Sequence, residues 1–180
     1  MTPQHTDRSA HALTRQADAF GPVALTTFAA NPAGSHLFRV QHEQLTALMT
    51  SILAATEVDV TGDAGVLARN KLTSLATLLP LHQSMEEGLV HRALSAEPRL
   101  RMTAETFERE MSPLVAELAA LSRRFPSASS IINSPRGEFA QACSSLFTRL
   151  QERFRREERD IFSAFDRVVG VGAVSVAVAA

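Results

Sequence analysis

Two histidines and two glutamates lie on apolar helical stripes, where polar side chains are unusual. His82 and Glu86 are four residues apart on one stripe, so their side chains are one helical turn from each other. His42 lies on a second stripe, and Glu157 lies on a third with Arg153 one turn before it. A buried, ionised carboxylate costs several kcal/mol unless it is paired or coordinates a metal. Because imidazole and carboxylate together suit iron, manganese or zinc, these residues predict a metal site.

Arg153 allows two further interpretations. Its guanidinium is a permanent cation whose planar fork matches carboxylates. It could therefore stand where a metal ion would otherwise stand and pair with Glu157 and Glu86, which would give a metal-free bundle. Alternatively, the long Arg153 side chain could extend into solvent while Phe154 packs inward. The sequence leaves both interpretations open.

The elements that must position these residues are helices, because four segments carry apolar residues at alternating spacings of three and four. The stripes are Phe38, His42, Leu45, Met49 and Ile52; Leu72, Leu75, Leu79, His82, Glu86, Leu89 and Ala93; Phe107, Met111, Leu114, Leu118, Leu121 and Phe125; and Phe139, Cys143, Leu146, Leu150, Arg153, Glu157, Ile161 and Phe165. No alternating strand pattern competes with them. Four such helices predict an all-α, antiparallel four-helix bundle.

Local signals set the expected boundaries. Ser35 is a plausible N-cap for the first helix, and Ser134 followed by Pro135 predicts the start of the fourth. Ser112 and Pro113 could restart the third helix. We expect a mobile N-terminal arm over 1–34, the bundle over 35–168, and an apolar C-terminal tail over 169–180.

Composition excludes several classes of protein. The 180 residues suit one domain, and 18 Lys and Arg against 19 Asp and Glu give a net charge of −1. That balance argues against a general nucleic-acid binder, which needs a basic surface. No apolar run is long enough to span a membrane, and no secretory signal is visible, so we expect a cytoplasmic protein. The single Cys143 excludes an internal disulfide framework and a cysteine-based zinc site.

Three motifs in order carry a resemblance to a known family. The segment His82–Leu89 contains His, three residues and a Glu pair, and Leu79 precedes it. The segment Phe38–Leu45 contains His42, and Arg153–Phe162 contains a second Glu pair followed by an apolar pair. Together they resemble the hemerythrin-like (HHE) cation-binding family over Ser35 to Val168. The resemblance implies a four-helix bundle with a non-haem di-iron centre held by His42, His82, Glu86 and Glu157.

The chain departs from the family pattern at two positions. Arg153 stands where the fourth-helix motif of the family begins with His. The third helix offers Met111, with Glu110 beside it, where the family has another His. Glu158 is an alternative to its neighbour Glu157. The resemblance therefore implies one or two iron ions, or none if Arg153 replaces the metal.

Two functions follow as expectations. The first is a metal protein that binds or senses oxygen or nitric oxide, and not an enzyme, because no nucleophile with a base at readable spacing appears. The second is a metal-free regulatory bundle that binds a protein partner. The segment Leu150–Glu158 is similar to the last helix of bacterial regulators that sequester a sigma factor. The remaining histidines, His5, His11, His36 and His91, have no partner at ligand spacing and are not expected in the site.

Overall fold

The computed structural model describes residues 34–56 and 62–178, with side chains up to residue 170. Every regular element in these ranges is helical, which confirms the predicted all-α class. The elements are α1 (His36–Ala54), α2 (Gly62–Glu86), the π-helical turn η2 (Glu87–His91), α3 (Arg92–Ala96), α4 (Arg101–Arg124), α5 (Ala128–Ile132), α6 (Glu138–Glu157), the π-helical turn η3 (Glu158–Phe162) and α7 (Ser163–Val178).

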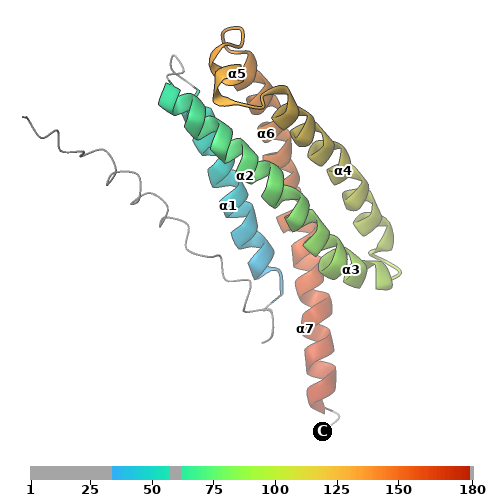
Figure 1. Ribbon diagram of the computed structural model, residues 1–180. Coiled ribbons are helices and arrows are strands. Elements are labelled where there is room, and N and C mark those ends of the chain that lie inside the picture. Colours follow the sequence, from blue (N-terminus) through green and yellow to red (C-terminus); the bar gives the residue numbers. More distant parts are fainter. Residues whose placement is uncertain (1–33, 57–61, 179–180) are drawn as a thin grey trace, which may run out of the picture. The chain divides into compact units, whose positions relative to one another are not determined.

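Four long helical rods make up the bundle. The second rod is α2 continued through η2 into α3, and the fourth is α6 continued through η3 into α7. Successive rods run in opposite directions (Figure 1). The first rod, α1, packs against α2 and α6, and α4 packs against the same two helices. Each rod therefore contacts two neighbours and presents one face to a common interior.

The apolar interior consists of two clusters. The first gathers residues from α1, α2, α4 and α6, among them Met49, Leu75, Leu118 and Leu150. The second lies around the π-helical turns and the start of α7 and includes Phe38, Val90, Phe107 and Phe162. Phe154 of the first cluster and Phe162 of the second both stack on the ring of His42. The buried polar residues of the candidate site thus lie where the two apolar clusters meet.

The prediction that the fourth helix begins at Ser134 and Pro135 is wrong, since α6 begins at Glu138. The Ser134 hydroxyl instead donates a hydrogen bond to the Ile131 carbonyl and so belongs to the end of α5. Gly137 precedes α6 with a positive φ of 78°, a conformation that glycine adopts without steric cost. Gly137 therefore forms the turn that directly precedes α6.

Neither internal proline of the long helices ends its helix. The proposed restart at Ser112 and Pro113 does not occur, because α4 runs unbroken from Arg101 to Arg124. Pro80 likewise lies inside α2. Both prolines are exposed, so the backbone carbonyl that each leaves without a donor is on the solvent side of its helix.

The N-terminal boundary of the bundle is fixed by an acidic side chain of α7. Ser35 precedes α1 as predicted, but its hydroxyl does not cap that helix. Its backbone N–H and its hydroxyl both donate hydrogen bonds to the Asp166 carboxylate, at 2.6 and 2.9 Å. These two hydrogen bonds link the start of α1 to α7, which belongs to the fourth rod.

The two predicted terminal segments are only partly described. Apart from its last residue, Gly34, the predicted arm over 1–34 lies outside the described residues. In the predicted tail over 169–180 the backbone is helical to Val178, as the continuation of α7. Within the part of the chain that the structure describes, no helix is long and apolar enough to cross a membrane.

Candidate metal centre

Six buried polar side chains gather in one layer of the bundle, each at most 4% exposed. They come from three of the four rods. They are His42 of α1, His82 and Glu86 of α2, His91 of η2, and Arg153 and Glu157 of α6. The structure thus brings together the four residues predicted as metal ligands and adds His91 and Arg153 to them.

Two imidazoles face each other across the interior. The Nε2 atoms of His42 and His82 are 3.1 Å apart. The outward Nδ1 of His42 lies 2.9 Å from Glu158 Oε1, and that of His82 lies 2.8 Å from Gln41 Oε1. Because both outer partners are acceptors, each Nδ1 carries the proton and donates it. Both Nε2 lone pairs then point at the same place.

Two carboxylates connect this imidazole pair to His91. Glu157 Oε2 is 3.6 Å from His42 Nε2, and its Oε1 is 4.0 Å from His91 Nε2. Glu86 Oε2 is 3.7 Å from His82 Nε2, and its Oε1 is 3.8 Å from His91 Nε2. We call His42 Nε2, His82 Nε2 and the two Oε2 atoms the imidazole half. The arginine half is His91 Nε2, the two Oε1 atoms and the Arg153 guanidinium.

Arg153 is fixed inside the bundle, so the interpretation that it extends into solvent is wrong. Its Nη1 forms an ion pair with Glu157 Oε1 at 2.7 Å, and its Nη2 donates a hydrogen bond to the Phe107 carbonyl at 2.8 Å. The guanidinium also lies over the Phe107 ring, 4.3 Å from its centre. Aromatic faces and planar carboxylates are the surroundings that favour arginine over lysine.

His91 enters the site because of a π-helical turn. In an α-helix, residues five apart point about 140° away from each other, since each residue turns the chain by about 100°. Glu86 directly precedes η2, in which the wider turn inserts one extra residue and brings Glu86 and His91 to the same face. Such insertions occur frequently at functional sites. The expectation that His91 has no partner at ligand spacing is therefore wrong.

The same insertion shifts the buried face of the second rod by one residue. The predicted stripe continues through Leu89 and Ala93, but Leu89 is 47% exposed. Val90 and Leu94 are buried instead. A second π-helical turn, η3, directly follows Glu157 on the fourth rod. Both glutamates of the site thus occupy the last α-helical position before a π-helical turn.

Burial keeps the three imidazoles neutral at physiological pH. It lowers the pKa of His42 and of His82 from 6.5 to about 3, and that of His91 to about 4. The positive charge of Arg153 acts in the same direction on all three. A neutral imidazole is the form that binds metals, so no proton has to leave before coordination.

Burial has the opposite effect on the two carboxyl groups. It raises the pKa of Glu86 well above 4.5, and the negative charge of Glu157 raises it further. Burial also raises the pKa of Glu157, against which the positive charge of Arg153 acts. One guanidinium therefore faces two carboxyl groups and pairs directly with Glu157.

The other predicted candidates lie at the edge of the layer or outside it. Glu110 is partly exposed and forms ion pairs with Arg156 at 3.1 Å and with Arg153 at 3.8 Å. Met111 is buried in the first apolar cluster. Glu158 offers its carboxylate to His42 Nδ1 and is 36% exposed. None of the three belongs to the two groups of possible ligands found among the described residues, His42–His82–Glu157 and Glu86–His91–Glu157.

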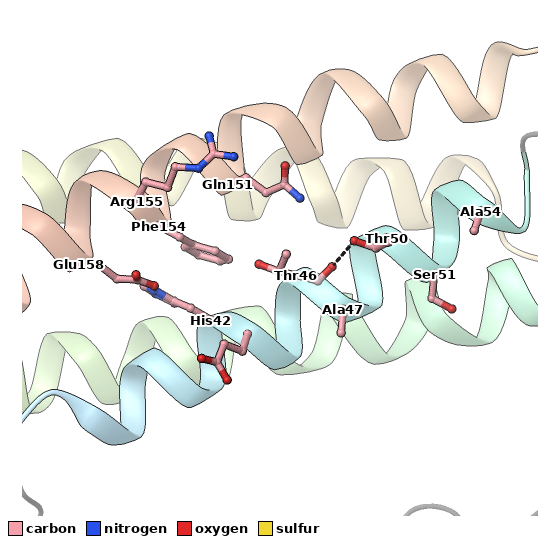
Figure 2. A pocket seen from close by; sticks show the side chains of 11 residues that line it. His42, Thr46, Ala47, Thr50, Ser51, Ala54, Gln151, Phe154, Arg155 and Glu158 are labelled. Carbon is pink, nitrogen blue, oxygen red and sulfur yellow. Dashed lines mark hydrogen bonds and ion pairs between the residues drawn. The ribbon is translucent and has the colours of Figure 1, made fainter.

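A groove between α1 and α6 leads to the imidazole half. Its cavity volume is about 630 Å³, and Thr46, Thr50, Gln151 and Phe154 contribute to its walls. Figure 2 shows His42 and Glu158 meeting across it, with the Phe154 ring beside them. The groove therefore reaches the outer edge of the His42 ring from solvent.

The residues present fit a metal ion. Two nitrogen ligands on one ion with bonds of about 2.0–2.1 Å are separated by about 2.9–3.4 Å at coordination angles between 90° and tetrahedral. The observed Nε2–Nε2 separation of 3.1 Å lies within that span. In addition, Glu86 Oε1, both ring nitrogens of His91 and Glu157 Oε2 are buried without a hydrogen bond among the described residues, whereas Glu157 Oε1 is paired with Arg153. Native proteins rarely leave buried polar atoms unsatisfied.

Comparison with known proteins gives one match. The family model described as "Hemerythrin HHE cation binding domain" matches residues 33–165. No curated protein and no solved structure matches the chain. The match covers most of the 180 residues and includes the whole buried polar layer.

Proposed function

The chain belongs to the hemerythrin HHE cation-binding family, and on this premise we propose that its bundle interior binds a divalent transition metal, with iron as the first candidate. We propose further that the metal centre binds or senses oxygen or nitric oxide. Imidazole suits iron, and carboxylate adds the charge that a divalent ion needs.

One observation carries this proposal: the His42 and His82 Nε2 atoms, 3.1 Å apart, both present lone pairs to one point. With both Nδ1 atoms protonated, the two Nε2 lone pairs face each other at this separation, and a cation between them removes their repulsion. The Glu158 and Gln41 oxygens hold both rings in this orientation from outside. Such outer hydrogen bonds orient metal ligands and fix their tautomer.

Binding rather than turnover is the activity that the surroundings favour. Phe154 and Phe162 both stack on the His42 ring and surround it with apolar surface. When bound, iron supplies a coordination position for a diatomic gas, and the groove beside His42 offers that gas a route. Among the described residues, no serine or cysteine nucleophile lies within the polar layer. We propose that this activity takes place in the cytoplasm.

The test is the metal content of the full chain, purified without added metal or an affinity tag. We expect iron to copurify with the wild-type protein and to be lost from His82→Ala, because that change removes one of the two facing nitrogens. His36→Ala is the matched control, since His36 is exposed at the start of α1. A wild-type chain that neither contains metal nor gains thermal stability from added iron or zinc would contradict the proposal.

A smaller effect is expected from the residue that orients His82. Gln41→Ala removes the acceptor of the His82 Nδ1 proton. We expect the affinity for metal to fall roughly 10–100-fold, as is typical when an outer partner of a ligand is lost. Titration of the metal-free chain measures this change. Gln44→Ala, an exposed position on the same helix, should bind as the wild type does.

The ion pair between Arg153 and Glu157 favours a second candidate function, a metal-free regulatory bundle that binds a protein partner. In that case the guanidinium provides the positive charge that a metal would provide. Half-exposed leucines on the second rod, Leu78, Leu81 and Leu89, would supply apolar surface for the partner. A protein without metal, unchanged in melting temperature by any divalent ion, would favour this function over the first.

A further inference from the structure

We propose that this chain holds one metal ion, in the imidazole half, and that the Arg153 guanidinium occupies the place of a second cation in the arginine half. This inference rests on the proposed function and specifies its stoichiometry. The relevant observation is that Glu86 and Glu157 each bridge the two halves. In both residues Oε2 lies in the imidazole half and Oε1 lies in the arginine half. The layer therefore offers two cation positions that share both carboxylates.

The two positions differ in what already fills them. In the imidazole half, no side-chain cation of the described residues lies among the two facing Nε2 atoms and the Oε2 atoms of both glutamates. In the arginine half, Glu157 Oε1 lies 2.7 Å from Arg153 Nη1 and 4.0 Å from His91 Nε2. The oxygen that would bind a second ion is thus already paired with a charged donor.

Arg153 is held in this place from three sides. Besides the ion pair with Glu157, it donates a hydrogen bond to the Phe107 carbonyl and lies on the Phe107 ring. These contacts leave little freedom for the guanidinium to withdraw when a metal ion approaches. Its side chain is 3% exposed, so it has no nearby solvent to enter.

Charge leads to the same stoichiometry. Two buried carboxylates face one guanidinium, which leaves one uncompensated negative charge when both are ionised. One divalent ion changes the net charge of these groups from −1 to +1, whereas two divalent ions would change it to +3. Buried charges of one sign repel strongly because the interior screens them poorly. Arg153 therefore admits one ion and opposes a second.

The route from solvent agrees with this assignment. Figure 2 shows that the groove between α1 and α6 ends at His42, which belongs to the imidazole half. Arg153 contacts α4 instead, through Phe107 and Glu110. The groove therefore borders a residue of the imidazole half and none of the arginine half.

Counting metal ions tests the inference. The metal-free chain is titrated with Co²⁺ and with Fe²⁺ under nitrogen, and bound metal is measured by elemental analysis after gel filtration. We expect one ion per wild-type chain and two per Arg153→His chain, because that change removes the fixed cation and adds a nitrogen ligand. Arg156→His is the matched control with one ion, since Arg156 also pairs with Glu110 and lies over the Phe107 ring.

A second variant assigns the additional ion to its half. Adding His91→Ala to Arg153→His should return the count from two to one, because His91 contributes only to the arginine half. Two ions in the wild type, or one in a folded Arg153→His chain, would overturn the inference while leaving metal binding intact. A wild-type chain without metal would instead overturn the proposed function and the one-ion state with it.

One measurement needs no variant and covers the case in which Arg153→His does not fold. Co²⁺ in the imidazole half of the wild type should give the electron paramagnetic resonance spectrum of an isolated high-spin ion, integrating to one spin per chain. A spectrum lost through coupling between two neighbouring ions would overturn the inference.

Discussion

Arg153→Ala is expected to lower the free energy of unfolding by about 3–5 kcal/mol, the cost of breaking a buried ion pair from one side. The change leaves Glu157, which is completely buried, without its cation at 2.7 Å. It also leaves the Phe107 carbonyl without its donor and removes a packed side chain from the Phe107 ring. These losses occur together because one side chain makes all three contacts.

Urea unfolding followed by circular dichroism measures this effect. Arg155→Ala is the matched control on the same helix, because Arg155 is 69% exposed and pairs with the exposed Glu152. We expect the control to cost roughly 0–1 kcal/mol. Equal losses in the two variants would show that Arg153 does not support a buried carboxylate.

Added metal should partly reverse the loss in Arg153→Ala. A ligand at a hundred times its dissociation constant stabilises the folded state by about 2.7 kcal/mol. The emptied place beside Glu157 Oε1 and His91 again suits a cation. The increase in melting temperature with Zn²⁺ should therefore be larger in Arg153→Ala than in Arg155→Ala.

The sequence was sufficient to predict the four-rod fold and the meeting of four site residues. Helical spacing alone placed His42, His82, Glu86 and Glu157 on faces that pack inward, since apolar stripes specify the buried side of a helix. The structure places these four side chains within one buried layer. It also decides between the two interpretations of Arg153 by burying it against Glu157.

The sixth member of the layer, His91, could not be found by the same reasoning. Spacing rules assume one turn length along a helix, and η2 changes it directly after Glu86. The sequence carries no clear signal of the extra residue, because Leu89 and Val90, three and four residues past Glu86, both fit a regular helix. Only the structure shows that Val90 and His91 are buried and that Leu89 is not.

The metal-free chain is expected to lose stability on acidification below about pH 6. Between pH 6.5 and 4.5, an unfolded chain protonates three histidines that the folded chain keeps neutral, since burial lowers the pKa of His42 and His82 to about 3 and of His91 to about 4. Stability rises with pH wherever the unfolded state binds more protons. Each such proton contributes about 1.4 kcal/mol per pH unit.

The buried carboxyl groups act with the opposite sign. The pKa of Glu86 and that of Glu157 are raised, so the stability they contribute is complete below about pH 4.5 and is lost as the pH rises through their folded values. Below about pH 5.5 the unfolded chain protonates nearly all three imidazoles, which outnumber the two carboxyl groups by one. The expected slope from pH 4.5 to 5.5 is therefore about 1.4 kcal/mol per pH unit or more. Near pH 6.5 the unfolded imidazoles are only half protonated, so the carboxyl groups offset them, and at higher pH stability falls.

Urea unfolding in the presence of a chelator, at half-unit steps from pH 4.5 to 8, measures this profile. His91→Gln removes one buried base and should reduce the acid-side slope by about 1.4 kcal/mol per pH unit. His36→Gln, at an exposed position outside the buried layer, is the matched control and should keep the wild-type slope. A profile that stays flat from pH 6.5 to 4.5 would mean that the three imidazoles are not held neutral in the folded chain. Excess metal should steepen the acid side further, because protons then compete with the ion for the same Nε2 lone pairs.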